Sequence, residues 1–200
     1  MSAVRDRMVE LATAVVGLGA GRASRDAYLD LIAPGEPAGA RQSFANLSSC
    51  GLVVRGLWGR LGINDPRLFA PYKFGSVIAT IDSMGREADA WRTADVDTLP
   101  GEGDVLLLDG DSPRAHVATV VRVLLSESTE DSVATLFTVD GGQRDGTGAE
   151  TILRRQRTLT LGPSGAFLDA RDFGPPAVRR LSAFLDLDAL AARFLPDGAS

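Results

Sequence analysis

One cysteine and one histidine are the residues best suited to chemistry in this sequence. Among 200 residues, Cys50 is the only cysteine and His116 is the only histidine. A cysteine thiolate attacks carbonyl carbons, and a neighbouring imidazole can take the thiol proton and later deliver it to a leaving group. Such a base must itself be oriented through its second ring nitrogen. Asp140 and Gln143, both in the segment VDGGQ, are polar residues that could do so.

Cys50 lies where a helix is expected to begin. The segment SFANLSSCGLVV leads into apolar residues at helical spacing, which predicts a helix over 50–61. At the first turn of a helix, the free N–H groups and the positive end of the dipole favour thiolate over thiol. Without a partner base, however, a cysteine at a helix start is more often a small packing residue than a nucleophile.

His116 and Asp140 are expected on neighbouring strands. His116 opens an apolar run at 115–125, and Asp140 closes the next run at 133–140. Antiparallel pairing of the two strands would bring the carboxylate toward the imidazole. Two plainer interpretations stay open: His116 as a core or edge residue, and Asp140 as a turn residue before Gly-Gly. Gln143 is a second candidate to orient the ring.

The order of expected elements predicts an α+β fold in a single domain spanning 1–200. Helices are expected near 4–15, 24–34, 50–61, 76–93 and 177–194, and strands at 103–108, 115–125, 133–140 and 151–161. Helices followed by a meandering antiparallel sheet are typical of that class. The segment RRQR at 154–157 could meet acidic substrate groups, but a solvated strand face is the favoured interpretation.

Composition excludes several classes of function. Asp and Glu number 26 against 21 Lys and Arg, a formal charge of −5, so neither nucleic acid nor an anionic membrane is an expected partner. The single cysteine and single histidine exclude an internal disulfide, a multi-cysteine zinc site and a His-rich metal site. The glycines of GLGAG at 17–21 indicate a helix stop, and DGDSP at 109–113 indicates a turn, so no cofactor is expected.

The N-terminal segment does not have the pattern of a secretory signal. Asp6 and Glu10 interrupt it, and no apolar run approaches the roughly 20 residues that span a bilayer. We therefore expect synthesis in the cytoplasm as a soluble protein. Export by a specialised secretion or phage-type route, which needs no such signal, is the alternative.

Taken in order, these features resemble the papain-like cell-wall hydrolases of the NlpC and CHAP type. The resemblance covers about residues 40–162 and includes a cysteine at a helix start, then GDVLLL, HVATVV and TLFTVDGGQ. It implies Cys50 as nucleophile, His116 as general base, and Asp140 as the third member, with Gln143 near a further polar residue. Gly103 and Asp104 match a Gly-Asp pair that is structural in the family. Ser49 departs from the pattern, because an acid or amide more often precedes the cysteine.

The resemblance implies N-terminal helices packed on a 4–6-stranded antiparallel sheet, and a cysteine peptidase or amidase whose substrate is a peptide or a peptidoglycan fragment. The Cys50 backbone N–H would stabilise the oxyanion, and Gln42 or Asn46 are the amides available as a side-chain donor. Tyr72 could line the groove, but a core or loop aromatic is the favoured interpretation. Two alternatives remain: a cysteine peptidase or deamidase with a cytoplasmic substrate, and a non-catalytic papain-like binding module. The binding module predicts a buried Cys50 distant from His116.

Overall fold

The computed structural model describes residues 2–21, 23–37, 40–41, 44, 49–69, 76–109, 115–126, 132–144, 146–170 and 177–196. The helices in these ranges are α1 (Ala3–Ala14), α2 (Arg25–Ile32), α4 (Cys50–Leu61), α5 (Pro66–Phe69), α6 (Ser76–Glu87) and α7 (Leu187–Phe194). The strands are β1 (Trp91–Arg92), β2 (Val105–Asp109), β3 (His116–Leu125), β4 (Ser132–Arg144), β5 (Glu150–Gly162), β6 (Gly165–Ala170) and β7 (Ala177–Leu185).

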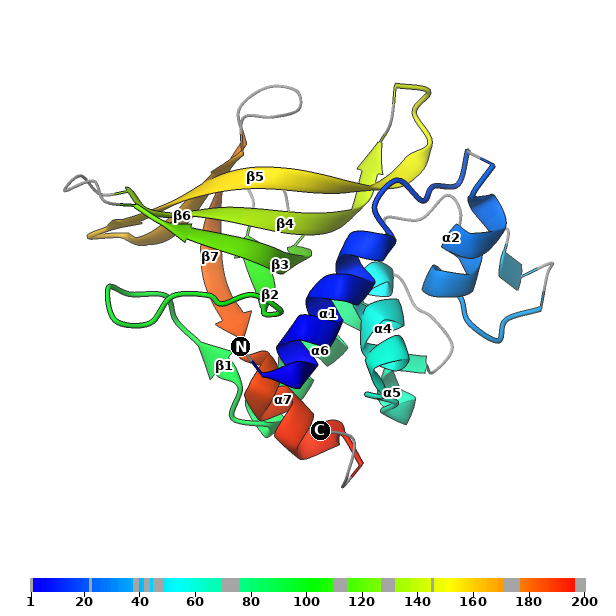
Figure 1. The fold of residues 1–200 in the computed structure, drawn as a ribbon, viewed down its shortest axis with the longest axis horizontal. Helices are drawn as coiled ribbons and strands as arrows, with labels where there is room; N and C mark the ends of the chain where they lie inside the picture. The colour runs from blue at the N-terminus through cyan, green and yellow to red at the C-terminus, as the bar shows by residue number, and fades with distance from the viewer. Residues whose placement is uncertain are drawn as a thin grey trace.

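Six of these strands close into an antiparallel barrel. The hydrogen-bonded order is β7-β2-β3-β4-β5-β6, and β6 pairs back onto β7. The short strand β1 pairs with the far end of β7, at Trp91 with Leu185 and Arg92 with Phe184. Figure 1 shows the long strands β4 and β5 on one side of the molecule and the helices gathered on the other.

The expectation of a papain-like fold, with helices packed on a 4–6-stranded sheet, is wrong. The structure is a barrel-type α+β fold, because β7 joins both β2 and β6 and so leaves no open sheet. The segment 177–194, expected to be one helix, divides at Asp186 into strand β7 and helix α7. Strand β6 was not anticipated.

A β-bulge explains why β7 resembles a helix in sequence. The register of β7 against β2 shifts so that Leu181 and Ala183 pair with consecutive residues, which leaves Ser182 as the extra residue. As a result, Leu181 and Phe184 both join the apolar cluster inside the barrel although they are three residues apart. A spacing of three is a helical signal, and a bulge of one residue produces the same pattern in a strand.

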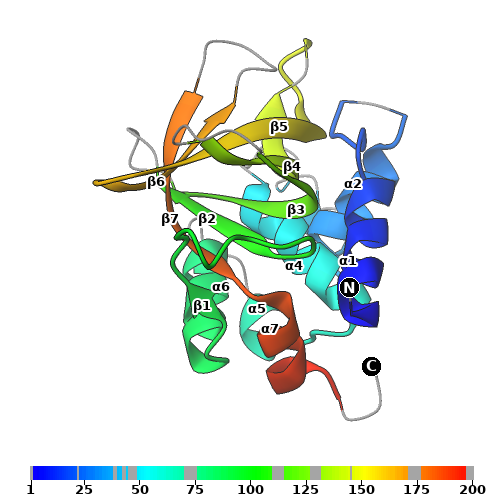
Figure 2. The same ribbon diagram turned by 60° about the vertical axis from the view of Figure 1, so that its left-hand side comes forward.

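Two apolar clusters stabilise the fold. One lies inside the barrel and includes Leu106, Leu136 and Leu168. The other joins the outward faces of the strands to the helices; it includes Trp58 of α4, which is fully buried. Helix α4 contacts α1, α2, α6 and the strands β3 and β4, so it is the central helix of this layer. Figure 2 shows the helices α1 and α4 side by side against the barrel.

The other expected elements occur close to their predicted positions. Helix α4 has the predicted bounds and ends at Gly62, whose φ of 105° is the left-handed conformation that glycine adopts most easily. The strands expected at 103–108, 115–125, 133–140 and 151–161 correspond to β2, β3, β4 and β5. Trp91, expected near the end of a helix, lies instead in β1. Within the described parts of the chain, no helix is long and apolar enough to cross a membrane.

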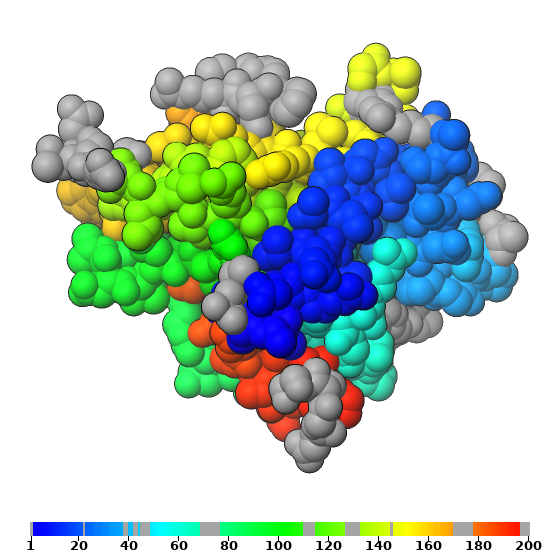
Figure 3. Space-filling model, in the orientation of Figure 1, coloured from blue at the N-terminus to red at the C-terminus, as the bar shows by residue number. Residues whose placement is uncertain are grey.

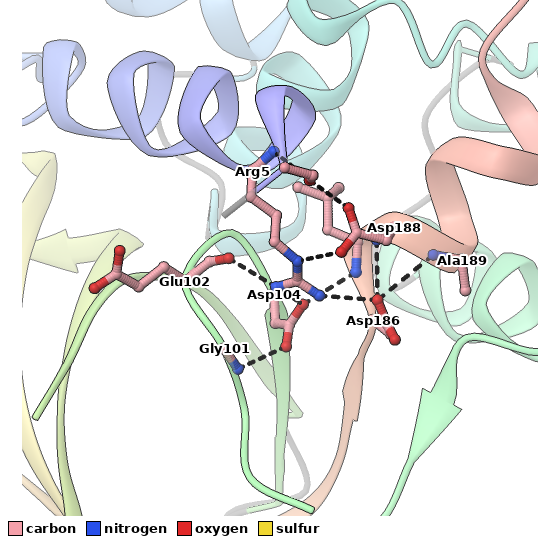
Figure 4. Close-up of polar contacts among 9 residues, drawn as sticks. Arg5, Gly101, Glu102, Asp104, Asp186, Asp188 and Ala189 are labelled. Atoms are coloured by element: carbon pink, nitrogen blue, oxygen red, sulfur yellow. Dashed lines mark hydrogen bonds and ion pairs between the residues drawn. The ribbon is translucent and has the colours of Figure 1, made fainter. Parts of the chain in front are cut away.

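A partly buried arginine joins the N-terminal helix to the C-terminal helix. Arg5 of α1 pairs with Asp104 at 2.7 Å, with Asp186 at 2.8 Å and with Asp188 at 2.5 Å (Figure 4). Asp104, which is 2% exposed, also accepts hydrogen bonds from the backbone N–H groups of Gly101 and Leu187. The Gly103–Asp104 pair therefore has a structural role in this fold. In Figure 3 the blue N-terminal segment crosses the molecule between the barrel and the red C-terminal segment.

Candidate active site

The structure brings Cys50, His116 and Asp140 together. Cys50 is the first residue of α4, His116 is the first residue of β3, and Asp140 lies within β4. The Nε2 atom of His116 lies 2.7 Å from Oδ2 of Asp140. The Cys50 side chain also lies near enough to His116 for each of the two groups to influence the pKa of the other. Because Asp140 occupies Nε2, Nδ1 is the ring nitrogen left for the sulfur.

The surroundings of Cys50 favour the thiolate. Burial opposes ionisation, since the residue is only 4% exposed. The hydrogen bond and charge of His116, together with the backbone N–H groups of Val117 and Gly51, more than offset that burial and lower the pKa of Cys50. The helix start and the histidine therefore act together on the sulfur.

The surroundings of His116 favour the imidazolium. Burial alone would lower the pKa of His116, but its hydrogen bond to Asp140 and its contact with Cys50 raise it above the ordinary value. For Asp140, burial is outweighed by the charge of Arg157 and the hydrogen bond with His116, so its pKa is well below the usual range. The two pKa shifts favour a thiolate–imidazolium pair, with the carboxylate of Asp140 behind the imidazole.

Arg157 lies behind Asp140 inside the barrel. Its Nη2 atom is 2.5 Å from Oδ2 of Asp140, and its Nε donates to Oγ1 of Thr138 at 3.1 Å. Thr138 in turn donates to Oδ1 of Asp140 at 2.5 Å. Arg157 is 2% exposed, so the favoured interpretation of RRQR as a solvated strand face is wrong at this position. The only sequence signal for the burial of Arg157 is the alternation along β5, which places Arg157 on the same face as the buried Leu159.

Ser49 holds the start of α4 in place. Its fully buried hydroxyl accepts hydrogen bonds from the Tyr28 hydroxyl and from the Gly142 backbone N–H, each at 2.8 Å, and donates to Glu150 at 3.5 Å. Three elements, α2, β4 and β5, are thus joined next to the nucleophile. Sequence reasoning noted Ser49 as a departure from the family pattern and did not anticipate this role.

The Gly-Gly that follows Asp140 brings β4 close to α4. A Cβ atom at Gly141 would lie 2.5 Å from Cγ2 of Val53 and 3.0 Å from the carbonyl oxygen of Ser49. Asp140 therefore does not start a turn; β4 continues to Arg144 through an irregularity in its register. Gln143 donates to the Gly141 carbonyl at 3.3 Å and accepts from Arg155 at 3.3 Å, so the contacts found for it do not include His116.

Some expected residues lie outside the described part of the chain. Gln42, Asn46 and Tyr72 are among them, as is most of the segment 109–113. The described residues contain no group of three or more His, Cys, Asp and Glu side chains that could hold a metal ion.

Comparisons with known proteins do not assign this chain to a family. No protein-family model matches the chain, and searches of curated proteins and of solved structures found no significant match.

Proposed function

We propose that this protein is a cysteine-dependent amide hydrolase, with Cys50 as nucleophile, His116 as general acid–base and Asp140 as the residue that orients the imidazole. The observation that carries the proposal is the contact of the single thiol with the single imidazole, whose other nitrogen is bound to a buried carboxylate. A cysteine that only fills space in the core does not require an imidazole beside it or a carboxylate that orients that imidazole. The binding-module alternative predicts a buried Cys50 that is distant from His116; Cys50 is buried, but its contact with His116 counts against that alternative.

The proposed reaction is acyl transfer through a thioester. The Cys50 thiolate adds to an amide carbonyl, and the His116 imidazolium then donates its proton to the leaving nitrogen as the C–N bond breaks. A water molecule loses a proton to the neutral imidazole and attacks the thioester, which releases the carboxylic acid and regenerates the thiolate. As the first helical residue, Cys50 has a backbone N–H without an intrahelical acceptor, and this N–H is the proposed oxyanion donor.

Peptidoglycan is the substrate that the sequence resemblance implies, and we propose it as the first to test. Purified peptidoglycan would be incubated with the wild type, Cys50→Ala, His116→Gln and, as a control, Arg122→Met, which replaces an exposed arginine farther along the same strand as His116. New amino termini would be quantified and the released fragments identified by mass. We expect His116→Gln to lose about 10²–10⁴-fold in rate, Cys50→Ala to be inactive, and Arg122→Met to keep full activity.

Two results would revise the proposal in different ways. Cleavage by Cys50→Ala at the wild-type rate would contradict cysteine catalysis. A wild type that leaves peptidoglycan intact, but whose Cys50 reacts as a thiolate, would contradict only the substrate and favour a different peptide amide.

A further inference from the structure

A cavity of about 260 Å³ lies directly beside His116. It is bounded by α6, β1, the end of β2 and the bulged part of β7, elements that lie close together in Figure 2. Ile78 of α6 forms part of its wall, and a Cβ atom at Gly51 would lie 3.2 Å from Cγ1 of Ile78. The cavity therefore borders the base, and one residue of its wall packs against the residue that follows the nucleophile.

One carboxylate on this cavity has no ion pair with the described residues. Asp82 pairs with Arg86 at 3.1 Å and accepts from Nε1 of Trp91 at 3.0 Å, while Arg86 stacks over the Trp91 ring at 4.6 Å. These three side chains satisfy one another. Asp109, at the end of β2, also lines the cavity and has no ion pair among the contacts of the described residues. The charged side chains of the lining, apart from His116, thus carry one net negative charge.

A residue that lines the same cavity has a buried hydroxyl with no partner among the described residues. Ser182 is the bulged residue of β7, and its Oγ atom is buried without a hydrogen bond in the described structure. A buried polar atom that is left unpaired costs free energy, so such an atom beside a cavity is suited to a ligand. Bulges are known to direct side chains toward sites in this way.

The proposed reaction determines which part of a substrate reaches this cavity. His116 must donate a proton to the leaving nitrogen, so the leaving group lies against His116. On that basis, which rests on the proposed function, we infer that the cavity is the leaving-group subsite and accepts an amine-bearing residue. The ammonium would face Asp109, its aliphatic portion would contact Ile78 and Trp91, and a polar atom would pair with Ser182.

Charged alkylating reagents can test this subsite independently of hydrolysis. Rate constants for alkylation of Cys50 would be measured with 2-bromoethylammonium, which is cationic, and with iodoacetamide, which is neutral. The ratio of the two constants would be compared among the wild type, Asp109→Asn and Asp97→Asn; Asp97 is an exposed aspartate that does not line the cavity. We expect Asp109→Asn to lower the cation-to-neutral ratio about 3-fold, as for a partly screened charge, with no change in Asp97→Asn.

Each outcome bears on one of the two proposals. An unchanged ratio in Asp109→Asn, or an equal fall in Asp97→Asn, would overturn the subsite while the hydrolase proposal stands. A Cys50 that reacts with iodoacetamide no faster than an ordinary thiol would overturn the hydrolase proposal, and the subsite would fall with it.

Discussion

Asp140 is fully buried and nevertheless stays charged, because three donors surround its carboxylate. Oδ2 accepts from both His116 and Arg157, and Oδ1 accepts from Thr138. A lone carboxylate in this position would be neutral, since burial strongly disfavours its charge. Arg157 is therefore as important to the orientation of the imidazole as Asp140, although the hydrogen bonds found for Arg157 go to Asp140 and Thr138.

This arrangement predicts strong coupling between Arg157 and Asp140. Arg157→Met should lower the free energy of unfolding by about 3 kcal/mol, because it leaves a buried carboxylate without its counter-charge. Asp140→Asn should have a similar cost, and the double variant should lose much less than the sum. Urea unfolding of the four proteins measures the coupling. Additive losses would show that the two side chains do not act as a pair.

The raised pKa of His116 predicts that stability depends on pH in a variant that lacks the Cys50 thiol. In Cys50→Ser, the hydrogen bond to Asp140 should still hold the pKa of His116 above its ordinary value of 6.5. A raised pKa means that the native state retains the proton, so the stabilisation is complete below pH 6.5 and disappears as pH rises through the folded-state pKa. Urea unfolding of Cys50→Ser between pH 5 and 9 should show this decline. Cys50→Ser/His116→Gln should not, and an identical profile in both would contradict the assignment.

At the scale of elements, the start of α4 is joined to β4 and β5 at Ser49. We expect Ser49→Ala to lower the free energy of unfolding by about 1–3 kcal/mol, because the Tyr28 hydroxyl and the Gly142 N–H lose a buried acceptor. Ser24→Ala is the matched control, since the Ser24 hydroxyl, at the start of α2, makes no hydrogen bond with the described residues. Thermal and urea unfolding would compare the two variants. Equal stability of Ser49→Ala and the wild type would contradict the anchoring role.

The elements that sequence reasoning could predict are those with an uninterrupted local pattern. Helix α4 and strands β2 to β5 have clear apolar periodicity, and their positions followed from it. Strand β7 was missed because the bulge at Ser182 gives Leu181 and Phe184 a helical spacing. Without β7 as a strand, closure of the barrel could not be inferred, and a packed open sheet was the simpler expectation.

At the scale of the whole molecule, contacts between distant parts of the chain could not be read from the sequence. Cys50, His116 and Asp140 could be proposed because few residues of their kind were available. Arg157 and Ser49 could not, since their roles depend on register across the barrel and on partners as remote as Glu150. A surface arginine and a buried one have the same appearance in a sequence.

The ion pairs of Arg5 connect the two ends of the chain and predict a global loss of stability when they are removed. Arg5→Met should lower the free energy of unfolding by about 3 kcal/mol, because Asp104 would keep a buried charge without its cation (Figure 4). Arg7→Met, on the same helix but exposed, should stay within about 0.5 kcal/mol of the wild type. Urea unfolding measures both. Similar losses in the two variants would show that Arg5 has no special role.

The rate of alkylation of Cys50 by iodoacetamide as a function of pH tests the central claim most directly. The wild type should reach half of its maximal rate well below the pKa of an ordinary cysteine thiol, which is about 8.5. The reason is that His116 and the helix start stabilise the thiolate. His116→Gln should shift this midpoint upward by removing the imidazolium. A wild-type midpoint near 8.5, or the same midpoint in both proteins, would contradict a thiolate–imidazolium pair.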